Sequence, residues 1–410
     1  MVQAGTLPRR RRSVRWTDDR PRSNEDAALS GDRRRPPASG PKRPPRDAKG
    51  SGRAAAPRET AFRDGPPREK PAREAPRERP VREEPRDEGA VRETAPREEG
   101  ARRTPPPRRE GARPAERLPV ILTVEPDADY ALLDCGDGEK LERYGPLTVR
   151  RPENQAIWPR LLPERAWEAA DAVFTGDTDE EGSGRWRFPK VPLGETWPLA
   201  HRGLSYLGRF TSYRHVGVFP EQASHWAFMT DAIEASRRPV RVLNLFGYTG
   251  LASLLAARAG AEVTHVDASK KAIGWARENA ELAGLTEKPV RWLCEDAVRY
   301  VEREVKRGSR YDIILLDPPR FGRGPKGEVW QLFEDLPHLL DQVRQLVSDR
   351  PIGVILTAYS IRASFYSLSA LMAESFRGMG GTVESGELVI REDNAEPRLL
   401  STSLFSRWKP

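Results

Sequence analysis

The chain has 410 residues, a formal net charge of +8 and two cysteines, Cys135 and Cys294. This length predicts two or three domains. Two cysteines without metal-ligand spacing argue against a disulfide framework and a bound metal, and no apolar run approaches the roughly 18 residues of a membrane-spanning helix. No apolar leader opens the chain, so the sequence predicts a cytoplasmic protein without a membrane partner.

Residues 1–117 hold half of the prolines and two aromatic residues, Trp16 and Phe62. They carry 32 Lys and Arg against 20 Asp and Glu, so the rest of the chain is slightly acidic. Such a segment cannot bury enough apolar surface to offset its ordering entropy, which predicts a disordered tail. It is either a solvated linker or an arginine-rich arm that contacts phosphates of a nucleic acid.

Residues 118–215 read as short strands separated by turns, with LPVILTV (118–124) as the first strand. The segment Ala166–Phe174 is compatible with one short helix. The pattern predicts a small β-rich lobe.

Residues 216–410 alternate between apolar strands and amphipathic helices, beginning with VRVLNLF (240–246). This rhythm predicts an α/β fold with a doubly wound parallel sheet. The last two strands, GTVESGELVIRED and RLLSTSLFSRW, are joined by a short charged loop, so we expect them to pair antiparallel.

In such a sheet, ligands bind beyond the carboxyl ends of the strands. The first strand runs into the turn Asn244–Gly250, in which Gly247 and Gly250 allow a close backbone approach. The full GxGxxG pattern of dinucleotide enzymes is absent, so the turn binds a nucleotide or is merely a tight strand–helix connection.

Three acids, Asp267, Asp296 and Asp317, end the next three strands. Asp267 is suited to the two ribose hydroxyls and Asp296 to an adenine amine, although either could instead cap the following helix. Together with the glycine turn they describe an adenosine-bearing ligand without a pyrophosphate. S-adenosylmethionine fits this description better than NAD.

The fourth strand leads into LLDPPRFGRGPKG. Pro318 and Pro319 stiffen the chain where it leaves the strand. Phe321 could stack on a base, and three basic side chains could meet phosphates: Arg320, Arg323 and Lys326. The alternative is an ordinary proline-stiffened surface loop.

The motifs NLFGYTG, HVDAS, CEDA and LLDPPRFGRGPKGEVW, with the upstream HVGVFPEQASHWAFM, resemble those of class I S-adenosylmethionine-dependent methyltransferases. They are most similar to the bacterial large-subunit (23S) rRNA methyltransferases and their shorter relatives. The resemblance covers roughly residues 120–410. It implies a Rossmann-like sheet of seven strands with a reversed last hairpin, and RNA as a partner.

The resemblance also implies site residues. It assigns the methyl donor to Phe219, Gln222, Asn244, Phe246, Gly247, Tyr248, Thr249, Gly250, Asp267, Asp296 and Ala297, and the transfer to Asp317, Pro318, Pro319 and Phe321.

One departure concerns chemistry. Relatives that methylate C5 of cytosine use a cysteine nucleophile, but neither LTAYS after the fifth strand nor the RFGRG loop contains one. A target with its own lone pair, such as guanine N7 or an exocyclic amine, fits better.

We therefore expect a methyltransferase that acts on a nitrogen of a base in RNA, and the resemblance implies ribosomal RNA. The alternatives are a methyltransferase for a protein or small molecule, a non-catalytic RNA-binding assembly factor on the same scaffold, and a nicotinamide oxidoreductase, which the missing third glycine disfavours.

Overall fold

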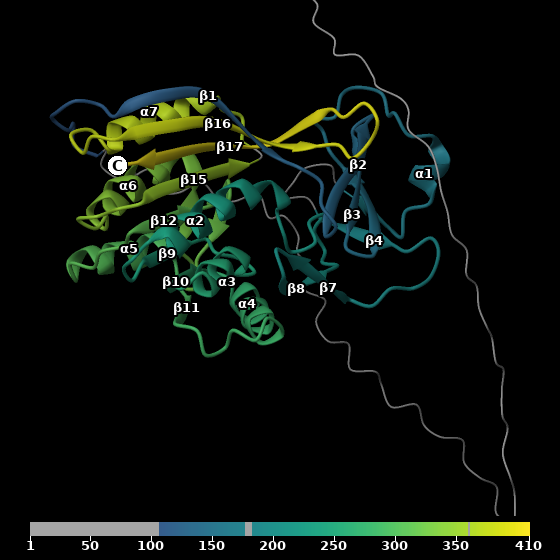
Figure 1. Ribbon diagram of the computed structural model, residues 1–410, viewed down its shortest axis with the longest axis horizontal. Coiled ribbons are helices and arrows are strands. Elements are labelled where there is room, and N and C mark those ends of the chain that lie inside the picture. The colour runs from purple at the N-terminus through teal and green to yellow at the C-terminus, as the bar shows by residue number, and fades with distance from the viewer. Residues whose placement is uncertain (1–105, 177–182, 360) are drawn as a thin grey trace, which may run out of the picture. The chain divides into compact units, whose positions relative to one another are not determined.

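A computed structural model describes residues 106–176, 183–359 and 361–410. Its main feature is an eight-stranded sheet in the order β1-β16-β17-β15-β12-β9-β10-β11 (Figure 1). The strands are β1 (Ala115–Val124), β9 (Arg241–Leu245), β10 (Glu262–Asp267), β11 (Val290–Cys294), β12 (Ile313–Leu316), β15 (Gly353–Tyr359), β16 (Thr382–Arg391) and β17 (Leu399–Lys409). The predicted strand–helix alternation is confirmed.

The five consecutive strands from β15 to β11 are parallel, and β17 pairs antiparallel with both β15 and β16. The reversed C-terminal hairpin is therefore confirmed. The chain runs from β9 to β10 and β11 on one side, then crosses to β12 on the other side of β9. Ligands of open α/β sheets bind at such a reversal of strand order, beyond the carboxyl ends of the strands.

Helices cover both faces of the sheet, which explains why its central strands read as unbroken apolar runs. In β9, Val242 belongs to one apolar core while Leu243 and Leu245 belong to the other. The first core takes side chains from α2 (Ala223–Ala235), α3 (Leu251–Arg258) and α4 (Lys270–Leu282); the second takes them from α5 (Ala297–Lys306), α6 (Leu332–Gln345) and α7 (Phe365–Ser375).

The first strand differs from the prediction. The run 118–124 was expected in the small lobe, but it belongs to β1, which pairs parallel with β16 at the edge of the large sheet. The sheet therefore has eight strands rather than the expected seven, and β1 is the additional strand. Local sequence cannot reveal this, because pairing with an edge some 260 residues away is decided by tertiary packing. Residues 115–117, predicted as tail, start this strand; residues 1–105 lie outside the described part.

The small lobe holds a five-stranded sheet in the order β2-β3-β4-β5-β6 and a separate β7-β8 hairpin. Its elements are β2 (Tyr130–Gly136), β3 (Glu139–Tyr144), β4 (Leu147–Pro152), α1 (Glu164–Glu168), β5 (Ala172–Gly176), β6 (Gly184–Arg187), β7 (Thr196–His201) and β8 (Leu204–Arg209). The segment 166–174, expected as one helix, is divided between the end of α1 and the start of β5. The β-branched and aromatic pair Val173 and Phe174 lies opposite Arg187 and Trp186 in the sheet, which favours strand there.

Two short elements complete the region around the strand ends. The 3₁₀ turn η1 (Pro220–Gln222) precedes α2, and the chain after β12 forms a small hairpin of β13 (Phe321–Arg323) and β14 (Val329–Gln331). Residues of both line the cavities at the carboxyl ends of the strands.

Candidate active site

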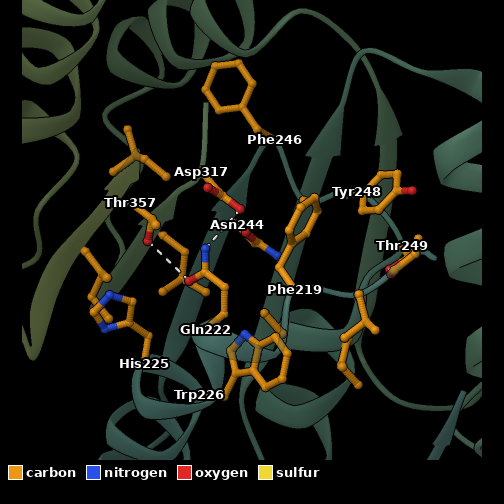
Figure 2. Close-up of a pocket in the computed structure, with 18 residues that line it drawn as sticks. Phe219, Gln222, His225, Trp226, Asn244, Phe246, Tyr248, Thr249, Asp317 and Thr357 are labelled. Atoms are coloured by element: carbon orange, nitrogen blue, oxygen red, sulfur yellow. Dashed lines mark hydrogen bonds between the residues drawn. The ribbon is translucent and has the colours of Figure 1, made fainter. Parts of the chain in front are cut away.

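Two adjoining cavities lie at the carboxyl ends of β9, β10 and β12, where the strand order reverses. Figure 2 shows the side chains that converge on the deeper one. The outer cavity has a volume of about 240 Å³ and contains all three strand-end acids, Asp267, Asp296 and Asp317. Phe219, Phe246, Tyr248 and Asp317 line both cavities, so the two form one continuous site.

The β9–α3 turn has an unusual backbone. Phe246 and Tyr248 adopt left-handed φ angles of 58° and 50°, which are uncommon for bulky residues and concentrate at functional sites. A Cβ on Gly247 would lie 2.4 Å from the ring of His265, so only glycine fits between the two aromatics. Gly247 itself lines the deeper cavity, so the turn forms part of the wall of the site.

Two side-chain hydrogen bonds hold the β9–α3 turn in place. The Thr249 hydroxyl donates to the Gly217 carbonyl at 2.7 Å, and the buried Asn244 amide donates to Ser253 at 2.9 Å. Asn244 also lines the deeper cavity. Gly250, at a φ of 83°, is the N-cap of α3 and lies outside the lining of both cavities.

Asp267 accepts backbone hydrogen bonds from Tyr248 at 2.9 Å and Ser269 at 2.7 Å. The N-cap of α4 is Ser269, so Asp267 is not that cap. Burial raises the pKa of Asp267, although the two backbone bonds oppose this. A carboxylate held at two points on the cavity wall is suited to accept from a vicinal diol.

Asp296 caps a helix and also lines the outer cavity. It caps α5, accepting from the Arg299 amide at 3.0 Å, and it also lines the outer cavity beside Ala297. One carboxylate has oxygens enough for a cap and a ligand amine.

Asp317 is at the end of β12, and its Oδ2 accepts from the Gln222 amide at 3.1 Å. Gln222 Oε1 in turn accepts from the Thr357 hydroxyl at 3.2 Å (Figure 2). Oδ1 of Asp317 is buried and has no hydrogen-bond partner among the described residues. Burial, followed by the charge of Glu221, raises the pKa of Asp317 to about 7. A buried polar atom without a partner is rare enough to require an explanation, and a ligand would supply one.

Aromatic rings form the walls of the site. Phe219 lies 6.0 Å from Tyr248 and 5.5 Å from Tyr359, and Phe246 lies 5.0 Å from Trp330, between ring centroids. Such rings suit a planar base or an adenine. Tyr359 and Trp330 were not predicted; an aromatic just past an apolar strand was the available signal for Tyr359.

A tryptophan from the following hairpin hydrogen-bonds to the Asp317-Pro-Pro loop. Trp330 donates to the Pro319 carbonyl at 2.7 Å and so fixes the β13–β14 hairpin beneath the loop. Pro319 and Arg323 line the outer cavity, whereas Pro318, Phe321 and Lys326 lie outside both linings. Phe321 pairs with Gln331 within the hairpin, and Trp330, not Phe321, provides the ring that faces the cavity.

Arg320 is exposed and lines a separate open groove with Arg214 and Arg362. The groove begins at Ala358, one residue beyond Thr357 on β15. Its basic side chains therefore lie close to the strand-end site without belonging to it.

A comparison with solved structures decides the family. The crystal structure of an S-adenosylmethionine-dependent methyltransferase from Agrobacterium tumefaciens is 62% identical, with a TM-score of 0.72, and the alignment covers 74% of this chain and 97% of that one. The chain belongs to the S-adenosylmethionine-dependent methyltransferases. The family described as "Conserved hypothetical protein 95" matches residues 226–341.

Curated relatives of the methyltransferase carry more specific names. Ribosomal RNA large subunit methyltransferase K of Neisseria meningitidis is 26% identical over 263 residues, which is 61% of this chain and 70% of that protein. Ribosomal RNA large subunit methyltransferase I of Aeromonas salmonicida is 35% identical over 136 residues, which is 33% of this chain and only 32% of that protein.

The site suits the methyl donor of this family. The donor is S-adenosylmethionine, which carries a diol, an adenine and an ammonium and supplies a methyl group on sulfur. Asp267 would supply acceptors for the diol, and Asp296 would supply an acceptor for an adenine amine.

Neither cysteine of the methyltransferase lines the site. Cys135 is buried in the small lobe, and the exposed Cys294 on β11 has its sulfur 3.6 Å from the Ala268 carbonyl. Within the described ranges there is no cluster of potential metal ligands and no helix long and apolar enough to cross a membrane.

Proposed function

We propose that the enzyme methylates a nitrogen of a base in RNA, in particular large-subunit ribosomal RNA, without a cysteine nucleophile. The single observation that carries the nitrogen target is the buried, unpartnered Oδ1 of Asp317 at the junction of the two cavities, an atom for which the described residues provide no hydrogen bond. A carboxylate oxygen accepts from an N–H group, and an exocyclic amine offers both that N–H and a lone pair.

The reaction then needs orientation rather than covalent catalysis. The nitrogen–carbon bond forms as the sulfur–carbon bond breaks, and the amine nitrogen gains positive charge. Asp317 holds the amine in line through its N–H and stabilises this charge, and afterwards the proton passes to Asp317 or to water. The aromatic walls formed by Phe219 and Tyr359 would hold the base.

RNA as the substrate is supported by three features. The relatives are named for ribosomal RNA, two exposed arginines, Arg320 and Arg362, line the groove beside the site, and residues 1–105 are rich in arginine. Arginine contacts to phosphates add affinity that falls with salt. We further propose that the protein acts in the cytoplasm, where ribosomal RNA is found.

A first experiment is calorimetric titration with S-adenosylmethionine, with NADH as the control. We expect binding of S-adenosylmethionine only. Incubation of labelled donor with large-subunit RNA, followed by nucleoside analysis, should yield an N-methylated base. Label in a C5-methylated pyrimidine would contradict the proposal, and label in protein or in small molecules alone would favour the alternative substrates.

Deletion of residues 1–105 distinguishes RNA from the other substrates. We expect RNA affinity to fall by about tenfold at low salt, with a weaker dependence on salt than the full chain shows. Donor affinity should stay the same. An unchanged RNA affinity would reduce residues 1–105 to a linker.

A further inference from the structure

Gln222 forms a bridge between Thr357 on β15 and Asp317 after β12 (Figure 2). We propose that Gln222, oriented by Thr357, is a positioning residue that holds Oδ2 of Asp317 and presents its Oδ1 to an N–H group of the methyl acceptor. This inference rests on the proposed function, and it assigns Gln222 to the acceptor side of the reaction rather than to closing the donor pocket.

The chemistry of the three groups fixes the direction of the bridge. An ionised carboxylate only accepts hydrogen bonds, so the amide must turn its NH₂ toward Asp317. The amide oxygen then faces Thr357, which must donate its hydroxyl hydrogen. The observed distances, 3.1 Å and 3.2 Å, fit this order. Thr357 itself is 2% exposed, so water does not readily take its place.

The bridge occupies one carboxylate oxygen and leaves the other. Because Oδ2 accepts from Gln222, the buried Oδ1 is the oxygen that remains for a ligand. A freely rotating carboxylate would present either oxygen in many directions. Fixing one oxygen fixes the line along which an N–H can approach, which is the orientation that in-line methyl transfer needs.

Gln222 also acts on the protonation of Asp317. Burial and the neighbouring Glu221 raise the pKa of Asp317, and the bond from Gln222 lowers it. His225 lines the same cavity, and burial lowers its pKa to about 3, so it brings no positive charge. The other charged groups that line the outer cavity with Asp317 are Asp267, Asp296 and Arg323. The bridge from Gln222 is the nearest contact that favours the ionised form among the described residues.

The consequence for the substrate is a requirement for an N–H donor. Guanine N7 has none, whereas exocyclic amines do. The proposal therefore favours an exocyclic amine over guanine N7 as the methylated group, since the reacting nitrogen of an amine itself carries a hydrogen that Oδ1 can accept.

The test replaces Gln222 by methionine, which has similar length and no hydrogen-bonding amide. We expect kcat on RNA to fall 10- to 100-fold and the acidic limb of the kcat/KM profile to move to higher pH. Donor affinity, measured by calorimetry, should change less than threefold. Thr357→Val should move the same limb in the same direction by less, and Thr357→Ser, which keeps the hydroxyl, should restore it.

Gln331→Met is the matched control. Gln331 is a half-buried glutamine on β14, outside both cavity linings, and its replacement should leave the pH profile in place. A Gln222→Met enzyme that loses donor affinity but keeps its kcat and its pH profile would overturn the proposal and return Gln222 to the donor pocket.

A readout without substrate separates this inference from the proposed function. The titration of the Asp317 carboxyl can be followed by ¹³C NMR, with Asp317→Asn identifying the signal. An upward shift of its midpoint in Gln222→Met supports the bridge even if RNA proves not to be the substrate. An unmoved midpoint would refute the bridge even if RNA is methylated.

Discussion

The small lobe and the carboxyl ends of the strands of the large sheet both bury a carboxylate. The surroundings lower the pKa of the carboxylate in the lobe and raise the pKa of the one at the strand ends. In the lobe, Glu142 is fully buried and accepts from Arg151 at 2.5 Å and from Tyr130 and Tyr144 at 2.9 Å and 3.1 Å. Burial alone would raise its pKa, but Arg151 and Lys140 overcome this and lower it to about 2. Every oxygen of Glu142 is satisfied.

At the sheet edge, Asp317 has an amide partner instead of a cation, and its pKa rises to about 7. The buried charge of Glu142 therefore stabilises the fold, whereas we expect that of Asp317 to serve the chemistry. Both oxygens of Glu142 have hydrogen-bond partners within the protein, whereas Oδ1 of Asp317 would gain a partner only from a ligand.

The largest effect should come from breaking the pair in the lobe. Arg151→Met leaves Glu142 buried without its cation, and we expect the free energy of unfolding to fall by about 3–5 kcal/mol. Denaturant titration measures this loss. Arg150→Met is the control, because Arg150 pairs with Glu139 on a more exposed surface and should cost about 1 kcal/mol or less. Equal losses in the free energy of unfolding for Arg151→Met and Arg150→Met would contradict the view that the buried pair of Glu142 and Arg151 is the one that the fold requires.

Asp317→Asn should instead raise the free energy of unfolding, which Arg151→Met lowers. The folded state raises the pKa of Asp317 from 3.8 to about 7, so its contribution to stability is present below pH 4 and lost as pH rises through 7. Asparagine removes this dependence. At pH 8 we expect the variant to gain at most about 4 kcal/mol in the free energy of unfolding. A loss of stability at that pH would show that the carboxylate is paired.

The activity of Asp317→Asn should meanwhile fall. Asparagine of the same shape no longer supplies a negative charge, and loss of such a group typically lowers kcat by about 100-fold or more. Donor affinity should stay within a few-fold. If donor affinity falls instead and kcat at saturation does not, Asp317 holds the donor's ammonium and the assignment to the methyl acceptor is wrong.

Asp267→Ala tests the other acid of the site. Without the carboxylate the ribose hydroxyls lose their acceptor, so the donor should bind at least tenfold more weakly, about 1.4 kcal/mol. Calorimetry measures this. Asp267→Asn keeps one acceptor oxygen, enough for the Tyr248 amide or the Ser269 amide but not for both, and should lose less donor affinity than Asp267→Ala. Unchanged affinity in both variants would remove Asp267 from the donor site.

Strand order made the acidic edge of the site predictable from the sequence. Parallel strands bring their carboxyl ends to one edge, so Asp267, Asp296 and Asp317 could be grouped from the sequence alone, and all three line the outer cavity. The antiparallel pairing of the C-terminal hairpin was predictable from its short loop. The position of η1 near the carboxyl ends of the strands was indicated only by the resemblance to related methyltransferases.

The features that could not be predicted depend on packing between distant segments. Thr357 looked like part of an apolar strand, yet its hydroxyl meets Gln222 from a segment 135 residues earlier. The edge strand β1 and the ring of Trp330 against the Asp317 loop are likewise products of tertiary contact. A polar residue inside the buried strand GVILTAY was the one local signal, because such a group needs a partner.

The smallest expected effect comes from Glu221, the buried neighbour whose charge helps to raise the pKa of Asp317. Glu221→Gln removes that charge, so Asp317 should ionise at lower pH and the acidic limb of the kcat/KM profile should move down by about half a pH unit, or about 0.7 kcal/mol. Gln222→Met should move the same limb upward, and the two shifts should partly cancel in the double variant, because both act on one carboxylate. If neither substitution moves the acidic limb of the kcat/KM profile, that limb reports the titration of a group other than Asp317. In that case a residue other than Asp317, at the carboxyl ends of the strands, would carry the charge that contrasts with Glu142.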